Sequence, residues 1–444
     1  MFSIPVQDLL AKLPLPEIAQ SLQQFLVPFV QVLPDQRLRA IVPLAVQGIL
    51  ASQSPLITQM AQSAPRTEGE PRAVSERFYR FCDNDRFTAR DVFHGLYRLA
   101  QRTVEREHPA YLVIAVDPVN FEKPYTIKLE GVSTVHKSTP PDRRGQARLT
   151  RGYPAITATI VNTRVPATTY ANWFSYKLDF ESENFEIRHA LRMSRWLFPQ
   201  QTLRFVGDAG LDDQKIFGWV AQVQGEFVIR ASDLSRLVEV YNERLDRWET
   251  EHLVDLVDTV PLEAQWQVAF THARNVRIAT IEVGWLRVRL PESGQRLWAV
   301  VAEDNAIPRR LVLLTNVPVQ AEADARAVYE DWRLRPRIEH GYRFDQEQGL
   351  DVEDLRLREL EGMKRLFALV LVAAQFVFEL MAQWPPRALY WLRKLGGKLD
   401  LVGERDGPYV LLRGLSAVLQ AVAALTHLAL HPFPHEDFDR WRCE

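Results

Sequence analysis

Apolar residues recur at helical spacing through residues 1 to about 105, in segments such as DQRLRAIVPLAVQGILASQS and SERFYRFCDNDRFTARDVFHGLYRLAQRTVERE. A joint rich in Pro, Gly and Ser, SAPRTEGEPRAVS, separates these two segments. The pattern therefore predicts a helical N-terminal region built from several helices.

Continuous apolar runs replace this helical spacing farther along the chain. AYLVIAVDPVNF (110–121) is the clearest buried strand, and YPAITATIVNT (153–163) and TTYANWFSYKLDF (168–180) predict two more strands. FEIRHALRMSRWLF then predicts a helix, and RFVGDAGLDDQKIFGWV (204–220) predicts a strand that runs into a helix. Strands that come first and then alternate with helices indicate a mixed α/β layer.

The pattern changes again from about residue 233 to 320, where segments such as RNVRIATIEVGWLRVRL alternate apolar with polar residues and predict an antiparallel sheet. Helices return at DARAVYEDWRLRPRIEHGYRFDQEQ and continue to the end of the chain. The apolar stretch at 366–384 holds Gln375 and Glu379 and is short for a membrane span, which favours a buried core helix.

Composition and charge narrow the function only a little. The chain has 444 residues, which predicts two to four units, and its formal net charge of -2 means that any DNA-binding surface must be a local patch. From Arg66 to Arg106 nine Arg stand against seven acidic residues, a slight excess that a solvated helix face explains. Cys82 and Cys443 offer no disulfide framework, and the N-terminal segment lacks a signal-peptide pattern, so we expect a reducing, cytoplasmic location.

Three acidic residues carry the candidate chemistry. Asp117 ends the first strand and Asp208 ends a later one, so that their carboxylates can point at one site. Such a pair is repulsive unless a cation lies between the two groups, and hard cations such as Mg²⁺ prefer carboxylate oxygens. Glu339 offers a third ligand on a helix that Pro336 begins, with Arg343 on the same face to hold a phosphate.

These residues resemble those of the DDE transposases of bacterial insertion sequences, over roughly residues 75–385. In that family an Asp ends a first strand, a second Asp follows a fourth strand, and a Glu on an Arg-rich helix follows a β-rich insertion. The subgroup with the insertion has a Tyr-x2-Arg-x3-Glu-x6-Lys signature, whose positions are taken here by Trp332, Arg335, Glu339 and Gln346. Two of these four residues differ from the signature. Trp332 replaces Tyr but keeps an aromatic ring, whereas Gln346 replaces Lys and lacks its positive charge, which Arg343 would supply.

The resemblance implies an RNase H-like α/β core interrupted by a β-rich insertion, with helical N-terminal and C-terminal regions. We divide the chain accordingly into a helical DNA-binding region (1–105), the first part of the core (106–232), the insertion (233–320), the second part of the core with the Glu helix (321–385) and a helical C-terminal region (386–444).

The resemblance also implies a reaction. Asp117, Asp208 and Glu339 would hold two Mg²⁺ ions, with Mn²⁺ as a substitute, about 3.5–4 Å apart. The same site would cut the ends of an insertion element and then join them to target DNA. The partners would be double-stranded DNA, namely terminal inverted repeats and target DNA, and a second copy of the protein in the synaptic complex.

Other DNA contacts are expected from the resemblance and from local charge. The loop RRGQARLTRGYP has no acidic residue among its four arginines, and we favour contact with the DNA backbone over a solvated loop. The residues expected to contact DNA are Trp332, Arg335, Arg343 and Gln346 with Arg143, Arg144, Arg148 and Arg151. In relatives an aromatic residue of the insertion stacks on a flipped base, but Trp266, Trp285 and Trp298 each fit the core of a small sheet better.

Plainer interpretations apply to several neighbouring residues. Asp212 and Asp213 fit helix-capping acids. His427, His431 and His435 are spaced by four, but Pro432 and Pro434 interrupt any helix there, which favours packing or surface roles.

Two other functions remain open at this stage. A catalytically silent relative that only binds DNA is motivated by Gln346, although all three acids are present. The other is an RNase H-like metal nuclease that cuts DNA without joining it.

Overall fold

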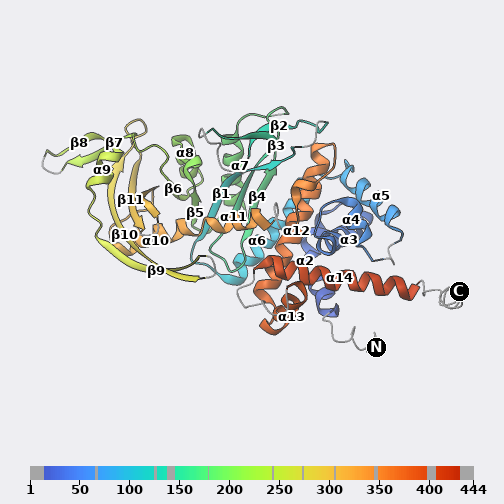
Figure 1. Ribbon diagram of the computed structural model, residues 1–444. Helices are drawn as coiled ribbons and strands as arrows, with labels where there is room; N and C mark the ends of the chain where they lie inside the picture. Colours follow the sequence, from blue (N-terminus) through green and yellow to red (C-terminus); the bar gives the residue numbers. More distant parts are fainter. Residues whose placement is uncertain are drawn as a thin grey trace, which may run out of the picture.

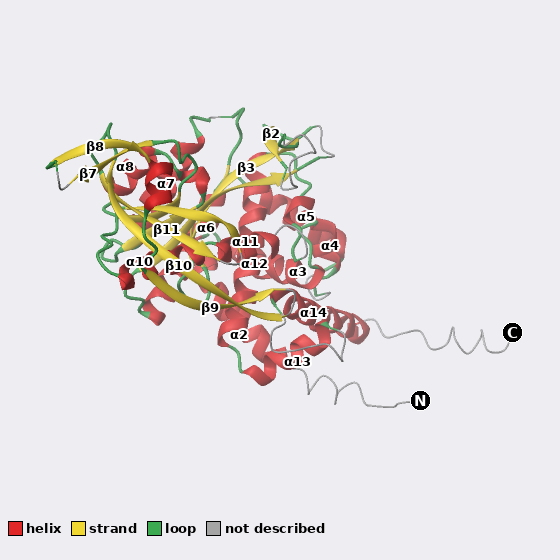
Figure 2. Ribbon diagram, turned by 60° about the vertical axis from the view of Figure 1, so that its left-hand side comes forward, coloured by secondary structure: helices red, strands yellow, loops and turns green. Residues whose placement is uncertain are grey.

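The computed structural model describes residues 15–65, 69–124, 128–137, 146–178, 180–242, 245–272, 275–304, 307–344, 349–397 and 407–430. It is a mixed α/β protein with one mixed sheet of 12 strands and helices packed on it. Figure 1 shows the helices near the two termini together at one end of the molecule and the strands β7 to β11 at the other. Figure 2 shows the same division, with the long strands β9 and β10 reaching along the edge of the molecule.

The strands follow the expected order with four short additions. β1 (Leu112–Glu122) is the apolar run expected at 110–121, and β3 (Leu149–Ile160) and β5 (Leu203–Gly207) also match expected strands. The additions are β2 (Ser133–His136), β6 (Glu226–Arg230), β7 (Leu237–Asn242) and β8 (Arg247–His252). The other strands are β4 (Ala167–Trp173), β9 (Ala264–His272), β10 (Asn275–Arg289), β11 (Arg296–Asp304) and β12 (Ile307–Thr315).

The expected strand over 168–180 is too long, because β4 ends at Trp173. Beyond it the chain turns back on itself at Ser175, which bridges to Leu178 and whose hydroxyl accepts a hydrogen bond from the backbone N–H of Lys177 at 3.0 Å. A local side-chain bond of this kind competes with the ladder of the sheet, which explains the early end.

Helices occupy the segments where apolar residues recur at helical spacing. Several have clear starts: Thr88 and Asp91 form a capping box at α6, and Asp35 caps α3. The helices are α2 (Leu15–Val32), α3 (Gln36–Ser52), α4 (Ile57–Gln62), α5 (Pro71–Cys82), α6 (Ala89–Glu107), α7 (Glu183–Leu197), α8 (Gln214–Gln222), α9 (Leu253–Thr259), α10 (Glu322–Arg333), α11 (Pro336–Arg343), α12 (Leu360–Gln383), α13 (Pro386–Gly396) and α14 (Pro408–Leu430), with short 3₁₀ helices η2 (Ala209–Leu211) and η4 (Val352–Asp354).

Strand β1 lies inside the sheet and sets its direction. It pairs antiparallel with β3 and parallel with β5, and β5 pairs parallel with β6. Beyond β6 the sheet continues directly into the strands of residues 237–315, because β12 pairs antiparallel with β6. The antiparallel pairing expected for that region is confirmed, but its strands extend the central sheet instead of forming a separate one.

The two faces of β1 pack against different helices. Its even-numbered apolar residues, such as Ile114, belong to the core that includes Phe93 of α6 and Leu191 of α7. Its odd-numbered residues, such as Ala115, pack with Tyr329 of α10 and with α11. Because side chains alternate along a strand, Asp117 points to the face that α10 and α11 cover.

Helix α12 is the central helix of the helical end, and most of its residues are buried. Within the described part of the chain, α12 and residues 408–425 of α14 are long and apolar enough to cross a membrane. Of these two windows, 72% and 44% of the residues are buried inside the protein, and the burial of α12 is that of a core helix. The core helix expected at 366–384 is therefore confirmed.

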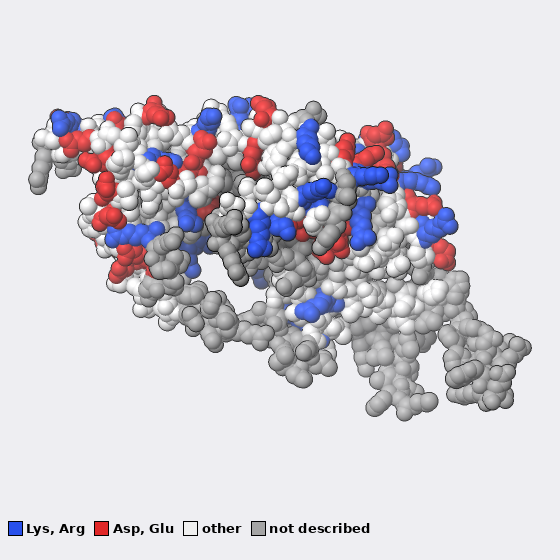
Figure 3. Space-filling model, turned by 45° about the horizontal axis from the view of Figure 1, so that its top comes forward, with Lys and Arg blue, Asp and Glu red and all other residues white. Residues whose placement is uncertain are grey.

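Charged side chains of both signs are interspersed over the face in Figure 3, which matches the net charge of -2. No uniformly basic face is present in that view. Any contact with a polyanion must use a local group of cations.

The end of β1 is fastened to the segment that follows α11. The backbone N–H of Glu122 donates to Oε1 of Glu353 at 2.9 Å. Nζ of the buried Lys123 donates to the carbonyls of Val352 at 3.2 Å and Leu355 at 3.3 Å, and also to that of Glu353. This anchor links the strand that carries Asp117 to the chain just after the helix that carries Glu339.

We expect Lys123→Met to lower the free energy of unfolding by about 1–3 kcal/mol, because buried carbonyls lose their donor. Burial lowers the pKa of Lys123 from 10.5 to about 8. Between pH 8 and pH 10.5 the unfolded chain holds the Lys123 proton more often than the folded one does. The free energy of unfolding of the wild-type protein therefore increases as pH rises through this range. Urea denaturation at steps between pH 7 and pH 10 measures the effect; a difference between the two proteins that does not grow with pH contradicts it.

Candidate active site

The three candidate acids come from three separate elements that meet at one edge of the sheet. Asp117 lies in the middle of β1, so the expectation that it ends this strand is wrong: pairing with β3 carries the strand on to Glu122. Asp208 follows β5 directly and precedes η2, as expected. Ala115 pairs with Val206 in the parallel register, so Asp117 and Asp208, each two residues farther, lie level on adjacent strands. Adjacent strands are about 4.8 Å apart. Glu339 lies in the first turn of α11.

One guanidinium contacts all three acids. Arg335 lies 2.5 Å from Glu339, 3.8 Å from Asp117 and 4.0 Å from Asp208, measured between its terminal nitrogens and the carboxylate oxygens. The side chain of Arg335 is only 11% exposed, and that of Asp117 only 16%. The acids expected from the sequence to converge therefore do so, around a buried cation of the chain itself.

Helix α11 is held against the sheet by Arg337. Its guanidinium donates to the carbonyls of Thr163 at 2.8 Å and Arg164 at 3.1 Å, and also to that of Val161. Ile338, in the same turn, is buried in the core beneath α10 and α11. These contacts join α11 to the end of β3 and so place Glu339 beside the ends of β1 and β5.

Trp332 joins α10 to the end of β5, the strand that precedes Asp208. Its indole N–H donates to the carbonyl of Gly207, the residue before Asp208, at 3.2 Å. Its ring packs partly buried against the core on the α10 side of the sheet. In this structure Trp332 thus positions the turn that carries Asp208, and its contact with DNA stays a prediction.

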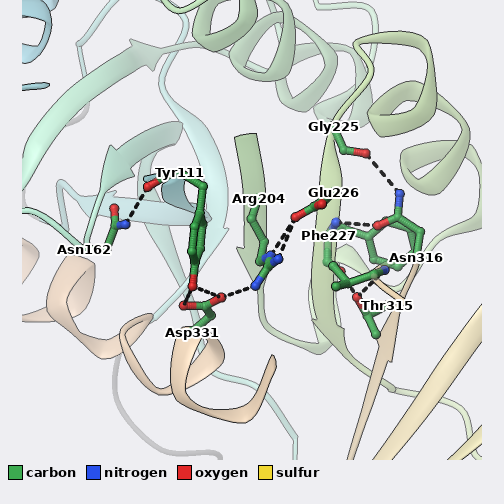
Figure 4. A network of polar contacts seen from close by, with 10 residues as sticks. Tyr111, Asn162, Arg204, Gly225, Glu226, Phe227, Thr315, Asn316 and Asp331 are labelled. Carbon is green, nitrogen blue, oxygen red and sulfur yellow. Dashed lines mark hydrogen bonds and ion pairs between the residues drawn. The ribbon is translucent and has the colours of Figure 1, made fainter. Parts of the chain in front are cut away.

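A buried polar network supports α10 just before Trp332 (Figure 4). Asp331 accepts from Nη1 of Arg204 at 2.5 Å and from the hydroxyl of Tyr111 at 3.1 Å, and Arg204 also pairs with Glu226 at 2.8 Å. Tyr111 precedes β1, Arg204 lies in β5 and Glu226 in β6. The network therefore joins three adjacent strands to the helix that leads into the candidate site.

Crowding of the acids appears in the pKa of Asp117. This pKa is raised from 3.8 to about 7, mainly by burial; the negative charges of Glu339 and Asp208 contribute to the rise, while Arg335 opposes it. A second cation, Arg230 at the end of β6, lies 3.5 Å from Oδ1 of Asp208. Sequence reasoning missed Arg230, because only the pairing of β6 with β5 brings it there.

The donor set suits a hard divalent cation. Three carboxylates offer the oxygens that Mg²⁺ and Mn²⁺ prefer. Oδ1 of Asp208 is buried and, within the described part, has no hydrogen bond, only the longer ion pair with Arg230. Among the described residues no three His, Cys, Asp or Glu side chains form a ready-made metal group, and a guanidinium lies among these acids. The oxygens of these acids therefore fit such ions by their chemistry, whereas the arrangement in the structure is that of acids paired with Arg335.

The other residues expected to contact DNA are only partly described. Arg148 and Arg151 are exposed near the start of β3, beyond Asp117 at the same edge of the sheet. Arg143, Arg144 and Gln346 lie outside the described residues, as does the side chain of Arg343 in α11. Their DNA contacts stay predictions.

Trp266, Trp285 and Trp298 pack in the core on the α10 side. Trp266 is 8% exposed, donates to Glu330 of α10 at 3.2 Å and meets the ring of Tyr329 edge-on. Trp285 and Trp298 are partly buried against the same core. The expected packing role is confirmed for all three.

The plainer interpretations have mixed outcomes. Asp213 caps α8 through the N–H of Lys215 at 2.7 Å, as expected. The capping role of Asp212 is wrong, because its carboxylate binds the backbone N–H of Ser232 at 2.7 Å and pairs with Arg236 at 2.6 Å. His427 lies in α14, whereas His431 and His435 are outside the described residues.

Comparison with known proteins adds little. No protein-family model matches the chain, and no curated protein matches it. Among solved structures the chain is similar to a piggyBac transposase, described as a synaptic complex with hairpin DNA, with a TM-score of 0.39 and 8% identity. The match covers 79% of this chain and 61% of that one. A likeness at this TM-score carries no argument about fold or function. Any argument about function therefore rests on the residues of the site.

Proposed function

We propose that this protein is a DDE-type transposase, which cuts the ends of a mobile element and joins them to target DNA. The observation that carries the proposal is the meeting of Asp117, Asp208 and Glu339 around Arg335. Three acids that are 91 and 131 residues apart in the chain are gathered although like charges repel, and a single guanidinium offsets only part of their charge.

The arrangement of the sheet supports an RNase H-like core. Strands β4, β3, β1, β5 and β6 are adjacent in that order, with β3 antiparallel to β1 and with β5 and β6 parallel to it. Asp117 stands in the middle of β1 and Asp208 directly after β5, and helices cover both faces of these strands. The strands of residues 237–315 then represent the β-rich insertion of the subgroup.

In this proposal the chain's own residues have distinct roles. Asp117, Asp208 and Glu339 would hold two Mg²⁺ or Mn²⁺ ions, which supply an activated hydroxyl and stabilise the leaving oxygen. Arg335 balances the three negative charges when the site is empty of ions. Once displaced, its planar guanidinium can bind a DNA phosphate with two hydrogen bonds. The protein would act on terminal repeats in the bacterial cytoplasm, as a dimer when two ends are held together.

The test first looks for inverted repeats in the DNA that flanks the gene and then uses a supercoiled plasmid that carries them. Incubation with the purified protein and Mg²⁺ or Mn²⁺ should yield cuts at the repeat ends and then joined products. Cuts without joined products would assign the protein to the nucleases. Binding without cuts under either ion would assign it to the silent DNA-binding relatives, and both results would overturn the proposal.

A variant of Arg335 tests the balance of charge without any DNA. We expect Arg335→Gln to lower the thermal midpoint of the ion-free protein, because three close carboxylates lose their counter-charge. We also expect it to bind Mn²⁺ about tenfold more tightly, about 1.4 kcal/mol, since no guanidinium must be displaced. Electron paramagnetic resonance counts the bound Mn²⁺ directly.

Arg230→Gln is the matched control, because Arg230 is half-exposed and contacts Asp208 alone among the three acids. It should change Mn²⁺ affinity much less than Arg335→Gln. Equal Mn²⁺ affinity in wild type and Arg335→Gln would contradict the role given to Arg335.

A further inference from the structure

A second group of cations lies away from the three acids, on helices α6 and α7. Arg90, His94 and Arg98 recur every four residues along α6, and His189, Arg192 and Trp196 lie on α7. The two helices both pack on β4, and Nε2 of Gln101 in α6 donates to the carbonyl of Leu197 in α7 at 3.1 Å. We call these six side chains the α6–α7 surface; Figures 1 and 2 show the two helices.

The arginines of this surface stay out of ion pairs in the described structure. Arg90, Arg98 and Arg192 are exposed and form no ion pair within the part of the chain that the structure describes. Asp91 acts electrostatically on His94, and Glu186 and Glu361 line the cavity beside this surface, where other groups bind them. Glu186 accepts from Tyr170 at 2.7 Å and from Asn172 at 3.0 Å. Glu361 accepts from the backbone N–H of Ala89 at 2.8 Å.

Trp196 gives a second, independent indication of a binding surface. Its side chain is 66% exposed, although large aromatic residues are usually buried. It meets the ring of His94 edge-on, with 6.4 Å between the ring centroids. Both side chains line a cavity of about 620 Å³ together with Arg90, Arg192 and Lys364. An exposed tryptophan among cations is typical of an interface.

The spacing of the cations selects the kind of partner. Arg90 and Arg98 are eight residues apart, which is about 12 Å along a helix. One small anion cannot contact both, whereas a duplex presents a phosphate every few ångströms along its axis. Acidic proteins also carry negative charge, but without this regular density.

We infer that the α6–α7 surface binds the phosphate backbone of double-stranded DNA, an inference that rests on the proposed function for its choice of partner. The surface lies on the face of the sheet that α6 and α7 cover, whereas Asp117 points to the face that α10 and α11 cover. The DNA segment bound here is therefore different from the segment that is cut. The slight arginine excess of residues 66–106 then reflects binding on α6, not only a solvated face.

The test compares two triple variants by fluorescence anisotropy with a labelled duplex at several NaCl concentrations. Arg90→Gln, Arg98→Gln and Arg192→Gln together remove three cations of the surface. Arg72→Gln, Arg80→Gln and Arg247→Gln together remove three exposed arginines that pair with Glu76 or Glu249 elsewhere. All six side chains are at the surface, so circular dichroism and the thermal midpoint should match wild type for both triples.

The slope of log affinity against log salt concentration should fall by about 0.9 for each phosphate that the protein no longer neutralises, or by roughly two to three for the surface triple. Affinity at about 0.1 M salt should fall at least tenfold, and the control triple should change the slope by less than one. An unchanged slope in the surface triple, or an equal change in the control, would overturn the inference. So would displacement of wild-type protein by poly-glutamate as effectively as by unlabelled duplex, because the surface would then suit acidic proteins.

Combined with the plasmid assay, these measurements separate this inference from the proposed function. If the protein cuts repeat ends and the surface triple binds DNA like wild type, the proposed function stands and the inference fails. If binding depends on the surface but no cut appears with either ion, the inference stands and the proposed function fails.

Discussion

Asp208→Asn is expected to abolish DNA cutting and joining, with a fall in rate on the order of 10⁴-fold, the size found when one member of a catalytic group that acts as a unit is removed. Asp208 follows the strand adjacent to Asp117, and its substitution removes one of the three acids that contact Arg335 in the described structure. The asparagine keeps the size of the side chain but lacks the negative charge that binds a divalent ion. Gel analysis of plasmid cuts in Mg²⁺ and in Mn²⁺ measures the loss.

The fold should survive this change, because the Asp208 side chain is 39% exposed and its ion pairs are 3.5 Å and 4.0 Å long. The thermal midpoint of the variant should lie within about 2 °C of wild type, as for most surface substitutions. Asp213→Asn is the matched control, since Asp213 caps α8 five residues farther along the chain. Full activity of Asp208→Asn would remove Asp208 from the catalytic group.

Arg204→Met should lower the free energy of unfolding by about 3–5 kcal/mol, because it leaves a buried carboxylate without its partner. Arg204 and Asp331 are 10% and 8% exposed in their side chains, and Arg204 also holds Glu226 (Figure 4). Burial already raises the pKa of Asp331, with Arg204 as the main opposing influence. The midpoint of urea denaturation, followed by circular dichroism, measures the loss.

A double variant separates the uncompensated charge from the change in packing. Arg204→Met with Asp331→Leu replaces the pair by apolar side chains of similar size, and we expect it to regain most of the stability that the single variant loses. A single variant as stable as wild type, or a double variant less stable than the single one, would show that the pair is not what holds α10 to β5.

The sequence was enough to select the acids but not to place what surrounds them. The apolar runs of β1 and β5 and the helix start at Pro336 marked the segments that carry Asp117, Asp208 and Glu339, and the family resemblance singled out these acids within them. Arg230 was missed because its strand has only five residues and its place depends on pairing with β5. Asp212 was misassigned because Ser232 and Arg236, its partners, lie 20 and 24 residues away in the chain.

Contacts between distant parts of the chain were also missing from the prediction of the sheet. Alternation of apolar and polar residues predicted the antiparallel strands between 233 and 320, because it depends only on local exposure. It did not predict that β12 would pair with β6, since a strand's hydrogen-bond partner leaves no mark on its own pattern. The network of Tyr111, Arg204 and Asp331 was likewise out of reach, because its members come from three distant segments.

The pairing of β12 with β6 has a consequence for solubility. Without the strands of residues 237–315 the sheet would end at Glu226–Arg230, with open N–H and C=O groups along that edge. Such a bare edge invites aggregation with other chains. These strands therefore shield a vulnerable border, and deleting them should yield an insoluble polypeptide.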